Sequence, residues 1–195
     1  MSFNYALSQE IYGGIPWMMD SFSFMTMSAI LKNSRNNVSL ELPDIKYNSP
    51  QLLNSETRVI TSPFGNGWEP GQLENNDDFS GVGIINLDGV ITLSGGMSSI
   101  GMEQLSNMML LMAQDKRMVG FVVRSNSGGG SSTAVGTMSD AILEVRAMGF
   151  PVYASIKKGG MAASACYGII SACEKIFSED GMNIVGSVGT MVQFE

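Results

Sequence analysis

Residues 118–132 read MVGFVVRSNSGGGSS, and this stretch sets the expected fold class. The mostly apolar residues 118–124 predict a buried β-strand. The Gly- and Ser-rich residues 125–132 predict a loop that connects this strand to a helix. Three successive glycines expose backbone N–H groups, which can bind an anion or stabilise an oxyanion. A plain flexible connection is the alternative interpretation, and the Gly-Lys-Ser/Thr of a P-loop is absent.

A second loop follows the next predicted strand, at residues 152–156. Residues 157–167 read KKGGMAASACY. Open α/β sheets place their sites where the strands end, so we expect the two loops to meet at one edge. Ser164 falls in the first turns of a helix expected over residues 161–173, whose N-terminus favours negative charge nearby. The G-x-S-x-G motif is absent, and a serine among alanines also suits simple helix packing.

The residues from 81 onwards alternate between strand and helix patterns. Such alternation predicts right-handed βαβ units and a largely parallel sheet. Periodicity predicts strands over 82–87, 90–93, 118–124, 152–156, 175–178 and 185–192, and helices over 102–114, 133–148 and 161–173.

Residues 1–80 have a different composition and lack this alternation, and we expect them to form an N-terminal extension. Residues 20–31 are rich in Met and aromatic residues and predict a helix, which packs in a core or against a partner subunit. Residues 32–78 contain four prolines and many Asn and Ser, and they predict a loop or arm. Residues 81–195 then form the second expected domain.

The composition excludes several classes of function. The chain has 195 residues, of which 44% are hydrophobic and 15% charged, so it can bury a core. A formal net charge of −7 argues against a nucleic acid or an anionic membrane surface as a partner. No apolar run is long enough to span a bilayer. Residues 1–14 lack the pattern of a secretory signal, so we expect a cytoplasmic protein.

The chain contains no histidine. This excludes a Ser-His-Asp or Cys-His arrangement and histidine-based metal sites within the chain. A general base must be Lys, Asp, Glu, Tyr or a partner's residue. Cys166 and Cys173 are about 10 Å apart along the expected helix. That separation is too long for a disulfide, so we expect free thiols. Cys166 is either a small packed residue or a reactive thiol.

Five short segments occur in an order that resembles a known family. They are GIINLDGVI at 83–91, NSGGG at 126–130, AASACY at 162–167, ACEKI at 172–176 and GSVGT at 186–190. They resemble the motifs of the signal peptide peptidase A-like serine peptidases, and more closely those of the phage and prophage capsid-maturation branch. The resemblance covers roughly residues 81–195. More loosely, the N-terminal extension resembles that of the phage-type members.

The resemblance implies a fold and a site. The implied fold is a crotonase-like or Clp-protease-like α/β spiral with a mostly parallel sheet, preceded by a loop-rich, partly helical arm. Ser164 is the implied nucleophile, and the N–H groups of Gly129 and Ala165 form the implied oxyanion hole. The implied substrate-binding residues are Gly128, Gly130, Met161 and Tyr167.

The resemblance also implies partners and excludes cofactors. The expected substrate is a protein or peptide, such as a phage capsid or scaffold protein. The expected assembly is a homo-oligomeric ring, in the host cytoplasm or associated with the virion if the protein is of phage origin. Neither a metal nor another cofactor is implied, because the family chemistry uses a serine nucleophile and a lysine general base.

Two positions depart from the family pattern. Gly128 stands where the family has proline. The catalytic lysine of the family lies farther along the chain than Glu195, so we expect the second domain to be incomplete at its C-terminus. Lys157 and Lys158 are the nearest substitutes, but between a strand and a helix they suit a surface position. A lysine from a neighbouring subunit is a further source.

Three functions therefore stay open. The first is a serine endopeptidase that processes a phage capsid or scaffold protein. The second is a catalytically inactive structural or scaffold-associated protein that keeps the fold, which the missing lysine favours. The third is an acyl-CoA enzyme on the same fold that uses the oxyanion hole alone, against which the AASACY motif speaks.

Overall fold

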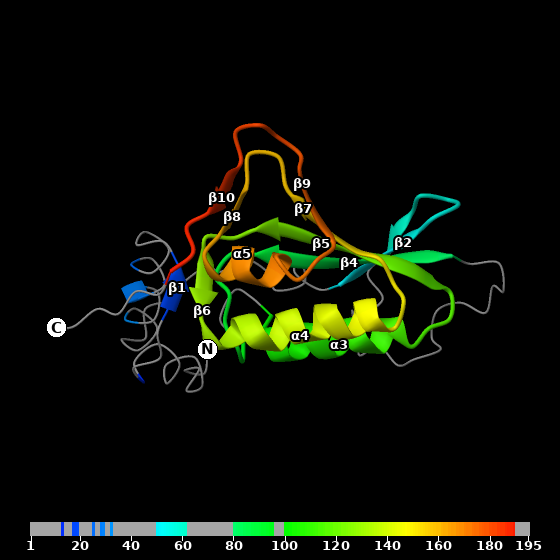
Figure 1. Ribbon diagram of the computed structural model, residues 1–195, viewed down its shortest axis with the longest axis horizontal. Coiled ribbons are helices and arrows are strands. Elements are labelled where there is room, and N and C mark those ends of the chain that lie inside the picture. Colours follow the sequence, from blue (N-terminus) through cyan, green and yellow to red (C-terminus); the bar gives the residue numbers. More distant parts are fainter. Residues whose placement is uncertain are drawn as a thin grey trace.

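The computed structural model describes residues 13, 17–19, 25, 28–29, 32, 50–61, 80–95 and 100–189. These residues form a mixed α/β fold (Figure 1). The strands are β1 (Trp17–Met19), β2 (Gln51–Asn54), β3 (Ile60–Thr61), β4 (Gly81–Asp88), β5 (Met118–Asn126), β6 (Gly129–Ser131), β7 (Val152–Ile156), β8 (Met161–Ala163), β9 (Lys175–Ser178) and β10 (Ile184–Gly186). The helices are α3 (Met102–Ala113), α4 (Thr133–Ala147) and α5 (Ala165–Ile170).

The central sheet has six strands in the order β3-β2-β4-β5-β7-β9. Strands β4, β5, β7 and β9 run parallel to one another, whereas β2 runs antiparallel to both β3 and β4. Helices α3, α4 and α5 lie in the connections between the parallel strands, as expected for βαβ units. The predicted α/β class with a mostly parallel sheet is confirmed, and the spiral arrangement stays a prediction.

Helices α3 and α4 lie side by side against one face of this sheet (Figure 1). The burial of the strands alternates accordingly. Phe121 and Val123 of β5 are buried towards the core, whereas Val122 between them is half-buried. The ring of Phe121 contacts that of Phe150 edge to face, with centroids 5.9 Å apart. The opposite face of the sheet is more exposed and carries the polar residues.

A hairpin of β2 and β3 extends the sheet at one side. Leu52 of β2 is buried and anchors it. The Asn54 side chain accepts hydrogen bonds from the Glu56 and Thr57 N–H groups, each 2.9 Å long, which closes the turn. These strands fall within residues 32–78, so the prediction of loop throughout that segment is wrong. Within this segment, Asn54 marks the turn between two short strands.

Most predicted elements correspond to observed ones. The strands predicted over 82–87, 118–124, 152–156 and 175–178 are β4, β5, β7 and β9, and the helices over 102–114 and 133–148 are α3 and α4. The strand predicted over 90–93 is wrong, because Gly89 adopts a positive φ of 75° and ends β4. Ile91 beyond it forms only an isolated bridge with Gly130.

Part of the N-terminal extension lies outside the described residues. Of the helix expected over 20–31, the structure describes only residues 25, 28 and 29, which are helical. Trp17, which precedes this segment, lies in strand β1 and is 3% exposed. The division into two domains near residue 80 stays a prediction.

Two neighbouring residues of α4 provide a test of this packing. Ile142 is fully buried, whereas Leu143 is 48% exposed. We expect Ile142→Ala to lower the free energy of unfolding by about 2–5 kcal/mol, because it leaves a cavity. Leu143→Ala is the matched control and is expected to change it by less than about 0.5 kcal/mol. Urea denaturation measures both values, and equal losses would contradict the packing described.

Candidate active site

Ser164 lies at a sharp turn between strand β8 and helix α5. Its backbone has φ 56° and ψ −117°, a left-handed conformation that is strained for a residue with a side chain. The helix predicted over residues 161–173 is therefore wrong in its first part, where a strand and a turn precede α5, and in residues 171–173, which lie beyond the end of α5. This strand–turn–helix geometry is that of a nucleophile elbow, although the G-x-S-x-G motif is absent.

The segment after β10 contacts Ser164 directly. The Ser164 N–H donates to the Gly186 carbonyl oxygen at 2.8 Å, and its Oγ donates to the Gly189 carbonyl oxygen at 3.3 Å. Strand β10 pairs with β8 in parallel. Ser164 is only 3% exposed. The strand predicted over 185–192 thus corresponds to β10 at its start, residues 187–189 are not a strand, and residues 190–192 lie outside the described part.

The glycine loop and the serine turn meet through backbone hydrogen bonds. The Ser127 N–H donates to the Met161 carbonyl oxygen at 2.9 Å, and the Ala163 N–H donates to the Ser127 carbonyl oxygen at 3.1 Å. These bonds form an isolated parallel bridge between the loop and β8. The expectation that the two loops lie together at one edge of the sheet is confirmed.

The two N–H groups assigned to the oxyanion hole have different environments. The Gly129 N–H donates to the Ser127 Oγ at 3.1 Å, and that hydroxyl donates to the Gly89 carbonyl oxygen at 2.5 Å. The Ala165 N–H belongs to the first turn of α5 and has no acceptor within the helix. Among the described residues the Ala165 N–H has no acceptor, so an oxyanion would be able to accept from it and would compete with Ser127 for the donor at Gly129.

Gly130 is required by a close backbone contact. A Cβ atom at this position would overlap the Ile91 carbonyl oxygen. The Ile91 N–H donates to the Gly129 carbonyl oxygen at 3.0 Å, and the Ser131 N–H donates to the Ile91 carbonyl oxygen at 2.8 Å. The residues predicted as a plain loop over 125–132 therefore include the end of β5 and strand β6.

The other predicted substrate-binding residues flank these strands. Gly128 is buried between β5 and β6. Met161 begins β8 and is half-buried, and its N–H donates to the Asn126 side-chain oxygen at 3.2 Å. Tyr167 on α5 is half-buried and packs against the core. Their roles with a substrate stay predictions.

Lys157 forms an ion pair that the sequence did not reveal. Its Nζ lies 2.7 and 2.6 Å from the two carboxylate oxygens of Asp88, the last residue of β4. The Lys157 side chain is 26% exposed and that of Asp88 is 25% exposed. Lys158 is exposed, and its backbone N–H donates to Glu179 at 3.3 Å. Within the part of the chain that the structure describes, no lysine donates a hydrogen bond to Ser164.

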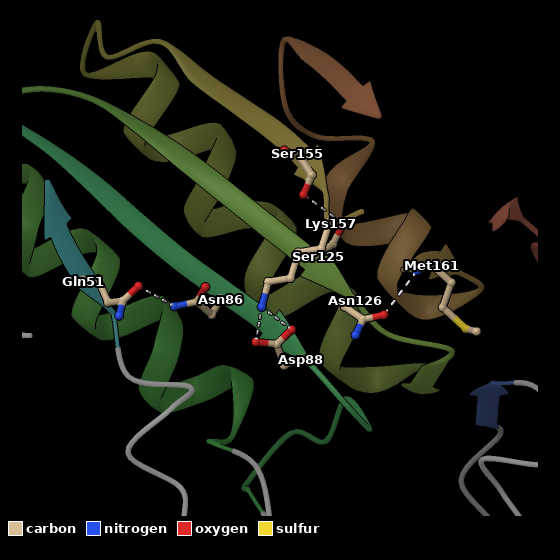
Figure 2. Close-up of polar contacts among 8 residues, drawn as sticks. All are labelled: Gln51, Asn86, Asp88, Ser125, Asn126, Ser155, Lys157 and Met161. Carbon is tan, nitrogen blue, oxygen red and sulfur yellow. Dashed lines mark hydrogen bonds and ion pairs between the residues drawn. The ribbon is translucent and has the colours of Figure 1, made fainter. Parts of the chain in front are cut away.

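Polar contacts fix the carboxyl ends of the strands on the more exposed face of the sheet (Figure 2). The Asn86 side chain of β4 donates to the Gln51 side chain of β2 at 3.4 Å. Asn86 lies two residues before Asp88 on β4, so this bond is close to the Asp88–Lys157 ion pair. Asn126 at the end of β5 accepts from Met161 across the neighbouring loop. The ends of β4, β5 and β7 are thereby joined beside the candidate site. Asp88-Gly89 after a buried strand is the sequence signal that marks this end.

Cys166 and Cys173 are free and buried, as expected. Burial raises the pKa of the Cys166 thiol to about 12, although hydrogen bonds with Ser125 and Ser127 favour the thiolate. Burial also raises the pKa of the Cys173 thiol to about 12. Both thiols are therefore protonated near neutral pH. Of the two interpretations of Cys166, the geometry favours the packed residue.

Comparisons with known proteins give one distant relative. No model of a protein family matches the chain. The chain is similar to Protease 4 of Haemophilus influenzae, with 27% identity over 126 residues, which cover 64% of this chain and 20% of that protein. The chain thus spans about a fifth of the length of this curated relative. The similarity supports a signal peptide peptidase A-like family, and a serine-type hydrolase by family resemblance.

Two further properties concern the described residues alone. None of their helices is long and apolar enough to cross a membrane. They also contain no group of three or more Cys, Asp or Glu side chains that could hold a metal ion.

The ion pair between Lys157 and Asp88 can be tested with a neutral side chain of similar length. We expect Lys157→Met to lower the free energy of unfolding by about 1–3 kcal/mol, because it leaves a partly buried carboxylate without its cation. Lys158→Met is the matched control and should change it by less than about 0.5 kcal/mol. Urea denaturation at neutral pH measures both, and an unaffected Lys157→Met variant would show that the pair does not hold these strand ends.

The raised thiol pKa values predict slow alkylation. At pH 8 we expect the folded protein to react with iodoacetamide at least about 100-fold more slowly than the protein in guanidinium chloride, because the thiolate is the reactive form. Mass spectrometry of the cysteine-containing peptides measures both rates. Rapid labelling of Cys166 in the folded protein would contradict the burial described and would make it a reactive thiol.

Proposed function

We propose that the whole protein is a serine endopeptidase of the Ser/Lys type. The observation that carries the proposal is the strained turn at Ser164, next to the Ala165 N–H at the start of α5 and bridged to the glycine loop. Strain of this kind gathers at functional sites, where it holds a side chain in a fixed position. The name of the similar protein, Protease 4, supports the same class of reaction.

The geometry suggests how each group would act. The Ser164 Oγ would exchange its hydrogen bond with Gly189 for one with a general base and attack the carbonyl carbon of a peptide bond. The base would take the hydroxyl proton and later donate a proton to the leaving amine. The Ala165 N–H, together with the Gly129 N–H, would stabilise the oxyanion that forms.

The general base would be a lysine other than Lys157 and Lys158. Lys157 is held by Asp88, so it does not suit this role. A lysine acts as a base near neutral pH only if burial lowers its pKa from about 10.4. We propose that this lysine comes from polypeptide beyond the described residues or from a neighbouring subunit of a homo-oligomeric ring.

The biological setting is part of the proposal. The motif resemblance favours the processing of a phage capsid or scaffold protein in the cytoplasm, without a nucleic-acid or membrane partner. The net charge of −7 supports the absence of a polyanionic partner. No cofactor is required by this chemistry.

A catalytically inactive scaffold protein is the second candidate. The observation that favours it is that Ser164 Oγ donates to a backbone carbonyl oxygen, at Gly189, rather than to a base. A fluorophosphonate distinguishes the two functions, because it labels only a serine that has been activated as a nucleophile.

We expect a fluorophosphonate to label the natural full-length protein at Ser164. Ser164→Ala should abolish labelling and lower kcat/KM on a protein substrate by about 10³-fold or more. Ser171→Ala, at the end of the same helix, is the matched control and should keep both. A wild-type protein that takes no label and cleaves no substrate would support the inactive scaffold, and labelling that survives Ser164→Ala would place the nucleophile elsewhere.

A further inference from the structure

Strand β6 has two edges, and segments from different parts of the chain cover them. On one edge, Ile91 bonds to the backbone of Gly129 and Ser131. On the other edge, β1 pairs antiparallel with β6, so that Trp17 lies opposite Ser131, Met18 opposite Gly130 and Met19 opposite Gly129 (Figure 1). Backbone groups of successive residues point to opposite sides of a strand, so β1 faces the N–H and carbonyl of Gly130.

Strand β1 also points towards the candidate active site. Its chain direction runs from Ser131 to Gly129 on β6, and Gly129 is one of the two residues assigned to the oxyanion hole. The loop that carries Gly129 is bridged to β8, which leads directly into Ser164. A peptide laid along β6 in this direction brings its successive carbonyl groups towards Ser164. Strand β1 thus occupies the place that an added peptide strand would take.

The contact between β1 and β6 combines a buried aromatic ring with an unpaired hydrogen-bond donor. Trp17 is 3% exposed, so its large ring is removed from water. Its Nε1 is buried without a hydrogen-bond partner among the residues that the structure describes. A buried donor without an acceptor weakens the gain from burial. The strand has three residues, which limits its backbone pairing. These properties suit a segment that can exchange with another peptide.

We infer that Trp17–Met19 is an intramolecular occupant of the peptide-binding edge of β6, and that a substrate binds there only after this segment has left. That the competing ligand is a substrate rests on the proposed function. The register also assigns a ligand class, an extended apolar peptide with a bulky side chain opposite Ser131. The segment therefore competes with substrate, rather than serving as a permanent strand of the fold.

The first measurement follows the docking of β1 without any catalysis. The chain has two tryptophans, so Trp68→Phe leaves Trp17 as the only tryptophan, whose emission is excited selectively at about 295 nm. In this background Met18→Pro removes the N–H that faces Gly130, whereas Met18→Leu keeps it. We expect Met18→Pro to shift the Trp17 emission to the red and to increase its quenching by acrylamide severalfold. Unchanged protection of Trp17 in Met18→Pro would overturn the inference.

The second measurement tests whether a peptide binds to the edge of β6 once β1 has left it. The probe is the fluorescein-labelled peptide GGIPFMMDSF, the chain's own residues 13–22 with phenylalanine in place of the tryptophan. All proteins carry Ser164→Ala, so that binding is read by anisotropy without cleavage. We expect the Met18→Pro protein to bind the probe about 10-fold more tightly than the Met18→Leu protein, because the docked segment no longer competes.

A second variant guards against misfolding. Trp17→Ala keeps every backbone N–H but removes the anchor, and it should also bind the probe more tightly than Met18→Leu. Circular dichroism confirms that each variant is folded. Equal affinity in all three proteins, with Trp17 exposed in Met18→Pro, would overturn the inference. Tighter binding in these variants, together with no fluorophosphonate labelling of the natural full-length protein that keeps Ser164, would support the inference and contradict the proposed peptidase.

Discussion

Ser127 donates its N–H to the Met161 carbonyl oxygen and accepts the Ala163 N–H, and these two bonds make one site out of two loops. The loops belong to different βα units and meet only at the carboxyl ends of their strands. The side chain of Ser127 extends the link to a third segment through its bond with the Gly89 carbonyl oxygen. The positions of both the glycine strand and the serine turn therefore depend on this residue.

The link between the two loops helps to hold the backbone of Ser164 in its strained conformation. A residue with a side chain at φ 56° costs about 1–3 kcal/mol relative to an ordinary conformation. The cost is offset on both sides of the turn. Before it, β8 pairs with Ser127 and β10; after it, Ile169 and Ile170 of α5 are fully buried. The strain is thus a property of the whole corner.

The parallel sheet and its two long helices could be predicted from the sequence, because apolar periodicity reports directly which side of an element is buried. Residues 152–156 and 175–178 are strands with the predicted bounds. The short elements could not be predicted in this way. Strands β8 and β6 contain alanines, glycines and serines, whose small side chains favour helix or loop and whose pairing depends on distant segments.

The candidate site was predictable to a similar degree. Motif order placed Ser164 and the glycine loop together, and the structure brings them together. The local geometry at Ser164 was missed, because a positive φ at serine is imposed by tertiary contacts rather than by propensity. The Asp88–Lys157 pair and the β1–β6 pairing join residues far apart in sequence. Neither leaves a periodic signal that a single sequence can reveal.

The uneven burial around Ser164 has a consequence for hydrogen exchange. Strand β5 is largely buried, whereas all four residues of β9 are exposed, as are Ile184 and Val185 of β10. Elements with few buried apolar contacts open at a lower free energy than the core. The amide hydrogens of β10 should therefore exchange through local opening, whereas those of β5 should exchange only through global unfolding. We therefore expect the residues that cover Ser164 to open as a separate, less stable cooperative unit than the strands that position it.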